Sequence, residues 1–266
     1  MECNKGDSSR IDVRSRIVVQ ETKRVSSISS GDVAAVFSAT PPLEAIRLVL
    51  SLCMTVRPGI DNDRVLSFLD ISRAHPHCDV LRENLYVNLP LESGVPPGYY
   101  GLLKRSLYGL RDAPQAFEKK VRELLEAMGF VRGVYSPCVF LHHTKHLIYV
   151  VHWDDFIGLG SRAGTAWVRE QLKRDLIVKD RGTMGPGVHD LKSIRLLNRL
   201  IIWKDATAFA PEELTWEGDV RHVEILAKQL GLSTHSPLRS TVSDKTNWKK
   251  KHPLLGTDLE AELVPV

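Results

Sequence analysis

The feature that most restricts the fold of this chain is an apolar stretch interrupted by two adjacent acids, Asp154 and Asp155. Residues 147–151 (LIYVV) and 156–159 (FIGL) are apolar and of strand length, which predicts a hairpin of two buried strands. Carboxylates cost several kcal/mol when they are buried without partners. The pattern therefore places both acids at the tip of the hairpin, on a sheet edge where a divalent cation could neutralise them.

A third acid, Asp70, follows another apolar run, VLSFL at residues 65–69. If this strand lies beside the hairpin, the three carboxylates converge. Carboxylate oxygens suit Mg²⁺, which also keeps room for substrate phosphates. Two such ions about 4 Å apart can activate a 3′-hydroxyl and stabilise a leaving pyrophosphate. Spacing alone also fits ordinary surface acids at turns, so the metal site needs further support.

The rest of the pattern predicts an α+β fold, in which helices cover an antiparallel sheet. Apolar residues at helical spacing, with proline near the start or glycine after the end, mark the helices. Short apolar runs bounded by turn residues mark the strands. The expected helices span 43–56, 116–128, 166–176 and 220–230, and the expected strands span 14–19, 65–69, 85–88, 139–141, 147–151, 156–159 and 194–203.

Composition excludes several classes of protein. The four cysteines are scattered without a CxxC pair, which argues against a zinc ribbon or a disulfide scaffold. The polar N-terminus is not a signal peptide, and no apolar run approaches the roughly 20 residues of a membrane span. We therefore expect an intracellular protein, cytoplasmic or nuclear. The net charge of +4 equals that of residues 239–252 alone. Within them, Lys249, Lys250 and Lys251 could contact a phosphate backbone or simply form a solvated tail.

Residues 106–117 (SLYGLRDAPQAF) are similar to the SLYGL-(K/R)-x-AP segment of copia-type retrotransposon reverse transcriptases. Other segments resemble further blocks of that family in the right order. These are RSRIVV (14–19), FSATPPLEAIRLVLSL (37–52), LDISRAHPH (69–77), LYVNLP with PPGYY (85–100), GFVRGVYSPCVF (129–140), VVHWDDFIGLG (150–160) and VRHVEILAKQLGL (220–232).

The resemblance implies a reverse-transcriptase-like palm with partial fingers over residues 13–240. A disordered segment is expected at 1–12 and a basic linker at 241–266. The implied activity is RNA-directed DNA synthesis on a template-primer from dNTPs. Asp70, Asp154 and Asp155 are the implied catalytic residues, which would bind two Mg²⁺ ions, with Mn²⁺ as a substitute. Other modules of a Pol polyprotein, such as protease and integrase, have no signature in this chain.

Further site residues follow from the same resemblance. Arg16 would contact the incoming triphosphate. His75 stands where the family has an aromatic ring that excludes a 2′-hydroxyl. Tyr108 and Gly109 would line the nucleotide pocket. Trp153 would lie near the nucleic acid at the hairpin tip.

Several residues depart from the family pattern. His152 and Trp153 replace the tyrosine and small aliphatic residue of the family hairpin, His75 replaces phenylalanine, and Ser136 replaces aspartate. A non-catalytic, reverse-transcriptase-like remnant that at most binds nucleic acid therefore remains an alternative. Two other functions are less well supported. A dinucleotide-binding site is disfavoured because the glycines after the hairpin are spaced GxGxxxG and not GxGxxG. A metal site formed by the histidines of HHTKH (142–146) is disfavoured because no fourth ligand is evident.

Overall fold

The computed structural model describes residues 2–4, 13–15, 17–22, 36–55, 63–208, 210–218 and 220–232. The chain divides into two compact units, residues 1–217 and residues 218–266. The second unit contains the helix α4 (Val220–Gln229), close to the expected span of 220–230. Every other element belongs to the first unit, except that β13 (Glu213–Gly218) ends at the boundary.

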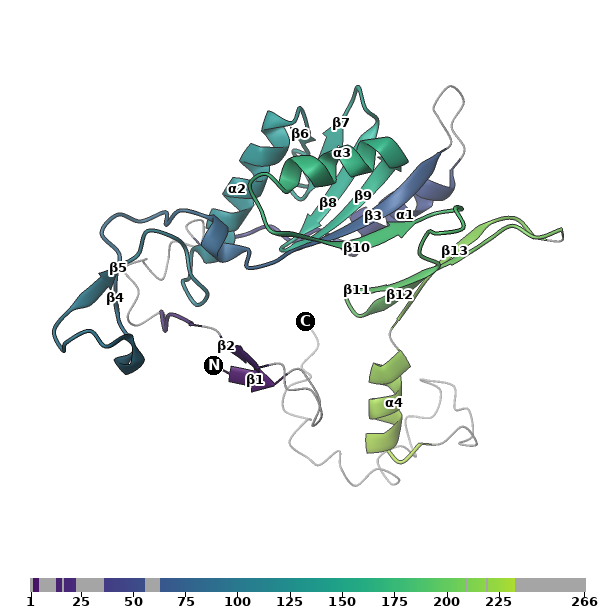
Figure 1. The fold of residues 1–266 in the computed structure, drawn as a ribbon. Helices are drawn as coiled ribbons and strands as arrows, with labels where there is room; N and C mark the ends of the chain where they lie inside the picture. The colour runs from purple at the N-terminus through teal and green to yellow at the C-terminus, as the bar shows by residue number, and fades with distance from the viewer. Residues whose placement is uncertain are drawn as a thin grey trace, which may run out of the picture. The chain divides into compact units, whose positions relative to one another are not determined.

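The centre of the first unit is a six-stranded sheet in the order β10-β3-β9-β8-β7-β6 (Figure 1). All its strand pairs are antiparallel. The mixed α and β composition with antiparallel pairing agrees with the expected class. The strands are β3 (Arg64–Ile71), β6 (Val131–Arg132), β7 (Val139–His142), β8 (Leu147–His152), β9 (Asp155–Ser161) and β10 (Val178–Met184).

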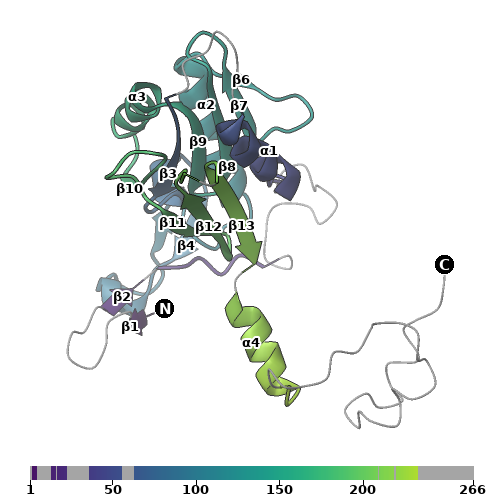
Figure 2. The ribbon, with the colours of Figure 1, turned by 90° about the vertical axis from the view of Figure 1, so that its right-hand side faces the viewer.

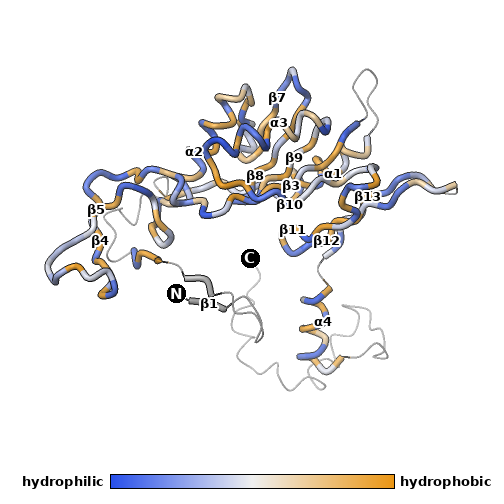
Figure 3. The backbone as a smooth tube through the Cα atoms, in the orientation of Figure 1, coloured by the Kyte–Doolittle hydropathy of each residue, from blue (hydrophilic) through white to orange (hydrophobic). Residues whose placement is uncertain are grey.

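Helices α2 (Ala113–Ala127) and α3 (Arg162–Leu172) pack with one face of this sheet, and α1 (Leu43–Met54) packs with the other (Figure 2). The second face also receives a three-stranded sheet of β11 (Ser193–Leu196), β12 (Arg199–Lys204) and β13. Hydrophobic residues are concentrated in the central strands between these layers (Figure 3). Burial on both faces explains why β3 and β9 read as continuous apolar runs.

Side chains of β3 alternate between the two faces, as strand geometry requires. Leu69 and Ile71 belong to the core under α2 and α3. Leu66 and Phe68 belong to the core under α1 and β11–β12. Asp70 follows the second set, so its side chain lies on the face that carries α1 and the small sheet.

Two predicted helices begin earlier in the structure than in the sequence prediction. α2 starts at Ala113 because Pro114 is tolerated in a first helical turn. α3 starts at Arg162, where the hydroxyl of Ser161 accepts a hydrogen bond from the Gly164 backbone nitrogen at 3.1 Å and caps the helix.

The prediction of one strand over 194–203 was wrong. β11 and β12 form a hairpin that turns at Leu197 and Asn198, with φ of 48° and 57°. Two consecutive positive φ values are typical of a tight two-residue hairpin turn. The sequence carries no glycine at this turn, which is why the apolar run looked continuous.

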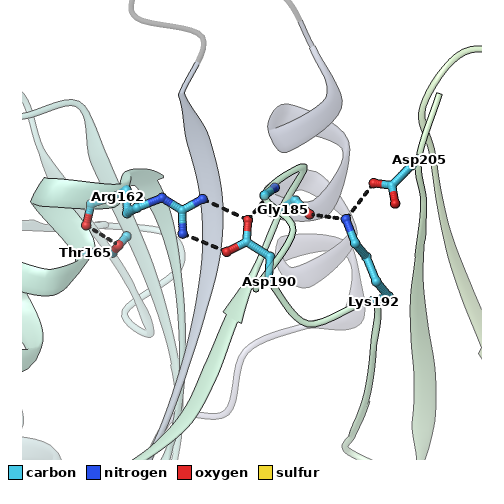
Figure 4. Close-up of polar contacts among 7 residues, drawn as sticks. Arg162, Thr165, Gly185, Asp190, Lys192 and Asp205 are labelled. Atoms are coloured by element: carbon cyan, nitrogen blue, oxygen red, sulfur yellow. Dashed lines mark hydrogen bonds and ion pairs between the residues drawn. The ribbon is translucent and has the colours of Figure 1, made fainter.

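A polar network fixes the connection from β10 to β11 (Figure 4). Arg162 at the start of α3 donates two hydrogen bonds to Asp190, at 2.7 and 2.8 Å. Asp190 also accepts one from the Gly187 backbone at 2.7 Å. Lys192 donates to the Gly185 carbonyl at 3.0 Å and pairs with Asp205 at 2.5 Å. These contacts join α3, the loop and the end of β12.

Smaller elements complete the first unit. β4 (Tyr86–Asn88) pairs with β5 (Tyr100–Leu102), and β1 (Glu2–Asn4) pairs with β2 (Val13–Ser15). β1 lies where a disordered segment was expected. In the part of the chain that the structure describes, no helix combines the length and apolar character of a membrane span.

Candidate functional site

Asp70 and Asp155 are direct cross-strand partners on β3 and β9, the central strands of the main sheet. Residues that face each other in this way project to the same side, with Cβ atoms about 5 Å apart. Both carboxylates therefore lie on the face that carries α1 and the small sheet. The two strands are neighbours, which meets the condition that the sequence sets for the acids to converge.

The third acid, Asp154, lies in the hairpin loop between β8 and β9. His152 and Asp155 are cross-strand partners, so Trp153 and Asp154 form a two-residue turn. Trp153 has φ of 59°, the sign that two-residue hairpin turns require at their first central position. The carbonyl of Asp154 accepts a hydrogen bond from the Ile71 nitrogen at 2.8 Å, which ties the loop to the end of β3.

The acid pair belongs to a row of charged and polar residues across four strands. The register places His152 opposite Asp155, Asp155 opposite Asp70, and Asp70 opposite Lys179 on β10. Like charges that face each other on neighbouring strands are destabilising. The central carboxylates of this row therefore favour a nearby cation.

In this structure a guanidinium supplies that positive charge. Arg181 of β10 pairs with Asp155 at 3.0 Å, and its second terminal nitrogen donates to the Arg195 carbonyl at 2.6 Å. Burial raises the pKa of Asp155 above its usual range, and the charges of Asp154 and Asp70 act in the same direction. Arg181 opposes this shift. Asp155 thus experiences the charge of both other acids.

The donor chemistry of the three acids suits a hard divalent cation, because all are carboxylates and two are held in register. Their present arrangement does not gather three ligands. Among the residues that the structure describes, no group of three or more His, Cys, Asp or Glu side chains is placed to hold a metal ion. Arg181 contacts one carboxylate oxygen of Asp155 in this arrangement. The histidines of the 142–146 loop form no such group either.

His75 and Tyr108 meet beside Asp154, on the face of the sheet that carries α2. Their ring centroids lie 4.7 Å apart at an interplanar angle of 50°. Burial lowers the pKa of His75, and the charge of Asp154 opposes the shift, so the imidazole and this carboxylate are electrostatically coupled. A cavity of about 200 Å³ adjoins them, and its lining includes His75, Tyr108, Phe117, Trp153 and Asp154. Its largely apolar wall could accept a planar ring.

Gly109 shows how closely the N-terminal segment approaches the turn that carries Tyr108. Its φ is 89°, and an added Cβ would lie 1.9 Å from the Val19 carbonyl oxygen. The Val19 nitrogen donates to the Tyr108 carbonyl at 2.8 Å. Only glycine fits this position.

Arg82 ties the same segment in place through two buried acids. It pairs with Glu21 at 2.7 Å and with Asp112 at 2.8 Å. The Glu21 carboxylate also accepts a hydrogen bond from the Arg111 nitrogen at 2.9 Å. The network joins residues 17–22, the segment before β4 and the start of α2.

Of the residues singled out from the sequence, the structure places Asp70 and Asp155 opposite each other on one face of the sheet. It places His75, Tyr108, Trp153 and Asp154 around one cavity on the face that carries α2. Gly109 supports the turn beside them. Arg16, Lys249, Lys250 and Lys251 lie outside the described residues.

Sequence reasoning missed Arg181, Lys179 and Arg82. Each acts through a partner at least 26 positions away or through strand register, and none belongs to a recognisable motif. The sequence pattern also predicts no strand where β10, which carries Lys179 and Arg181, is found.

Comparisons with known proteins agree on one family. Residues 3–186 match the family model described as reverse transcriptase (RNA-dependent DNA polymerase). The retrovirus-related Pol polyprotein from transposon TNT 1-94 of Nicotiana tabacum is 22% identical over 251 residues, which cover 92% of this chain and 17% of that polyprotein. The corresponding polyprotein from transposon RE1 of Arabidopsis thaliana is 29% identical over 134 residues, which cover 49% of this chain and 9% of its own length. The chain thus spans a small share of these relatives. No solved structure matches.

Proposed function

Because the chain belongs to the reverse transcriptase (RNA-dependent DNA polymerase) family, we propose that it is the polymerase domain of a copia-type retrotransposon. In this proposal, residues 13–240 form the palm and partial fingers and extend a primer 3′-hydroxyl with dNTPs along an RNA template. One observation carries the proposal: Asp70 and Asp155 face each other on the central strands, with Asp154 in the adjoining turn. Sheet register sets the positions of Asp70 and Asp155.

Asp70, Asp154 and Asp155 would hold the divalent cations, Mg²⁺ or Mn²⁺. When bound, these cations would supply positive charge to the reacting phosphate and lower the pKa of the primer hydroxyl. The protein's own contribution is positional. β3 and β9 fix two of the carboxylates, and the hydrogen bond from Ile71 to the Asp154 carbonyl fixes the turn.

His75 and Tyr108 would form the wall against which the incoming nucleotide packs. Their tilted ring pair borders the cavity beside Asp154, where a sugar or base could be excluded or admitted by shape. Gly109 keeps the Tyr108 turn against the N-terminal segment. Arg16, just before that segment, would contact the triphosphate.

Trp153 would lie against the primer end. The residue is 49% exposed at the hairpin tip, so a base could stack on its ring. The basic residues Lys249, Lys250 and Lys251 would contact the nucleic acid backbone.

Primer extension tests the proposal. The full chain is incubated with poly(rA), an oligo(dT) primer and dTTP in Mg²⁺ or Mn²⁺. The expected result is elongation that depends on both template and metal. Absence of elongation with either metal would contradict the polymerase function of this chain.

The second candidate is a non-catalytic remnant, and two observations favour it. Arg181 already occupies Asp155, and bulky Trp153 stands in the turn that carries the acids. The double variant His152→Tyr, Trp153→Val separates the two cases. Extension by this variant but not by the wild type would identify a reverse transcriptase inactivated at the hairpin.

A further inference from the structure

We infer that Arg181 is a built-in countercation of the Asp70–Asp155 pair, which a divalent metal ion must displace from Asp155 before it can bind there. The inference rests on the proposed function, since it concerns the same carboxylates. It assigns a role to a residue outside the acid set, namely control of the metal affinity of the site.

A β-bulge directs Arg181 toward the acids. The pairing of β10 with β3 shifts between Asp180 and Gly182, so Arg181 is the extra residue. Bulges bend a strand and re-aim a side chain, and they are common next to active sites. The Asp180 carboxylate accepts a hydrogen bond from the Gly182 nitrogen at 2.9 Å, which holds the bulge. Asp180 itself pairs with Arg169 of α3 at 2.5 Å, so the guanidinium on the acid face is that of Arg181.

Two acceptors hold the Arg181 guanidinium in place. One terminal nitrogen lies 3.0 Å from Oδ1 of Asp155, and the other lies 2.6 Å from the Arg195 carbonyl on β11. The Arg181 and Asp155 side chains are only 29% and 20% exposed. Water and salt therefore screen this pair less than a surface pair. A guanidinium fixed by two acceptors is pre-organised, which strengthens the contact with Asp155 that a competing cation must break.

The row of cross-strand partners His152, Asp155, Asp70 and Lys179 explains why the acid pair favours a nearby cation. Asp70 and Asp155 face each other in register, and Asp154 adds a further negative charge that acts on Asp155. Arg181 relieves part of this repulsion while no metal is bound. Because the guanidinium and a metal ion on Asp155 would compete for the charge of one carboxylate and repel each other at short range, stabilisation of the metal-free state by Arg181 opposes metal binding.

The direct test is a Mn²⁺ titration of the full chain without nucleic acid, in which electron paramagnetic resonance measures free Mn²⁺. Arg181→Gln should bind Mn²⁺ about tenfold more tightly than the wild type, since a charge-assisted hydrogen bond no longer competes. Mn²⁺ should also raise the melting temperature of this variant more than that of the wild type.

Arg132→Gln is the matched control. Arg132 also bridges a carboxylate, Glu118, and a backbone carbonyl, that of Pro137 at 2.7 Å. Its exposure and that of Glu118, 22% and 26%, are close to those of the Arg181 pair. It lies on β6, at the opposite edge of the sheet from β10. Its Mn²⁺ affinity should equal that of the wild type.

The possible outcomes separate this inference from the proposed function. Equal affinity of wild type and Arg181→Gln, with binding lost in Asp155→Asn, would overturn the inference and leave the metal role of the acids intact. An equal gain in the Arg132→Gln control would also overturn it, as a general effect of removing positive charge. Absence of Mn²⁺ binding in every variant would contradict both proposals.

A conservative variant covers the case in which Arg181→Gln does not fold. Arg181→Lys keeps the charge but lacks the fork that reaches Asp155 and the Arg195 carbonyl together. Its Mn²⁺ affinity should exceed that of the wild type. An affinity equal to that of the wild type would contradict the inference.

Discussion

Replacement of Arg82 by methionine should destabilise the protein strongly, because it removes the positive partner of two buried acids. Arg82 contacts Glu21 at 2.7 Å and Asp112 at 2.8 Å. The two acid side chains are only 7% and 6% exposed, so water cannot solvate them when the guanidinium is removed. Loss of one partner of a buried ion pair costs about 3–5 kcal/mol. We expect Arg82→Met to lower the free energy of unfolding by that amount.

Arg105→Met is the matched control. Arg105 pairs with Asp79 at the same distance of 2.8 Å, but these side chains are 59% and 82% exposed. Exposed pairs contribute about 1 kcal/mol or less. Urea denaturation with linear extrapolation measures both values, provided that the slope with denaturant is unchanged.

A third variant tests the cause of the loss. Arg82→Met combined with Glu21→Gln and Asp112→Asn removes all three charges, and should recover most of the stability lost by Arg82→Met. Equal losses for the Arg82 and Arg105 variants would refute the reasoning. No recovery in the neutral triple variant would show that packing, and not uncompensated charge, causes the loss.

Three further predictions concern backbone conformation and acid stability. Trp153→Gly should be about 1 kcal/mol more stable than Trp153→Ala in urea denaturation. Both variants remove the ring, but only glycine adopts φ of 59° without strain. Equal stabilities of the two variants would contradict this. Gly109→Ala should prevent folding, so that no cooperative unfolding transition is seen, because its Cβ would lie 1.9 Å from a backbone oxygen. Gly94→Ala, with φ of 68° and open space, should lower the free energy of unfolding by only about 1 kcal/mol. The hydrogen bonds from Arg162 lower the pKa of Asp190 in the folded state. Their stabilisation is therefore fully present above the pKa of the unfolded state, about 3.9, and is lost as the pH falls through the lower pKa of the folded state. Acid titration of the melting temperature should show a smaller decrease for Asp190→Asn than for the wild type.

Local sequence patterns predicted the elements that lie next to the acids. The apolar runs before Asp70 and around Asp155 mark strands buried on both faces, and the structure places them side by side. The strands could be inferred because apolar period and turn residues are local properties of the chain, whereas their pairing could be stated only as a condition. The helix at 43–56 was likewise close to the observed Leu43–Met54, since its apolar positions follow helical spacing.

The electrostatic partners of the site could not be predicted in this way. Arg181 reaches Asp155 because a β-bulge adds one residue to β10. The local sequence contains no motif that predicts this irregular pairing. Arg82 and Glu21 are 61 positions apart and meet only when the N-terminal segment packs on the turn before α2. Long-range ion pairs depend on tertiary packing, which hydrophobic periodicity does not encode.

The central claim is that Asp70, Asp154 and Asp155 together perform nucleotidyl transfer. The most direct test measures the rate of dTMP addition to an oligo(dT) primer on poly(rA) by the wild type and by each single aspartate-to-asparagine variant. Asp175→Asn, which removes a surface acid paired with Lys120 at 3.7 Å, is the control. We predict that each of the three site variants loses at least about a hundredfold in rate while the control retains it. A wild-type rate in any of the three site variants would contradict the claim.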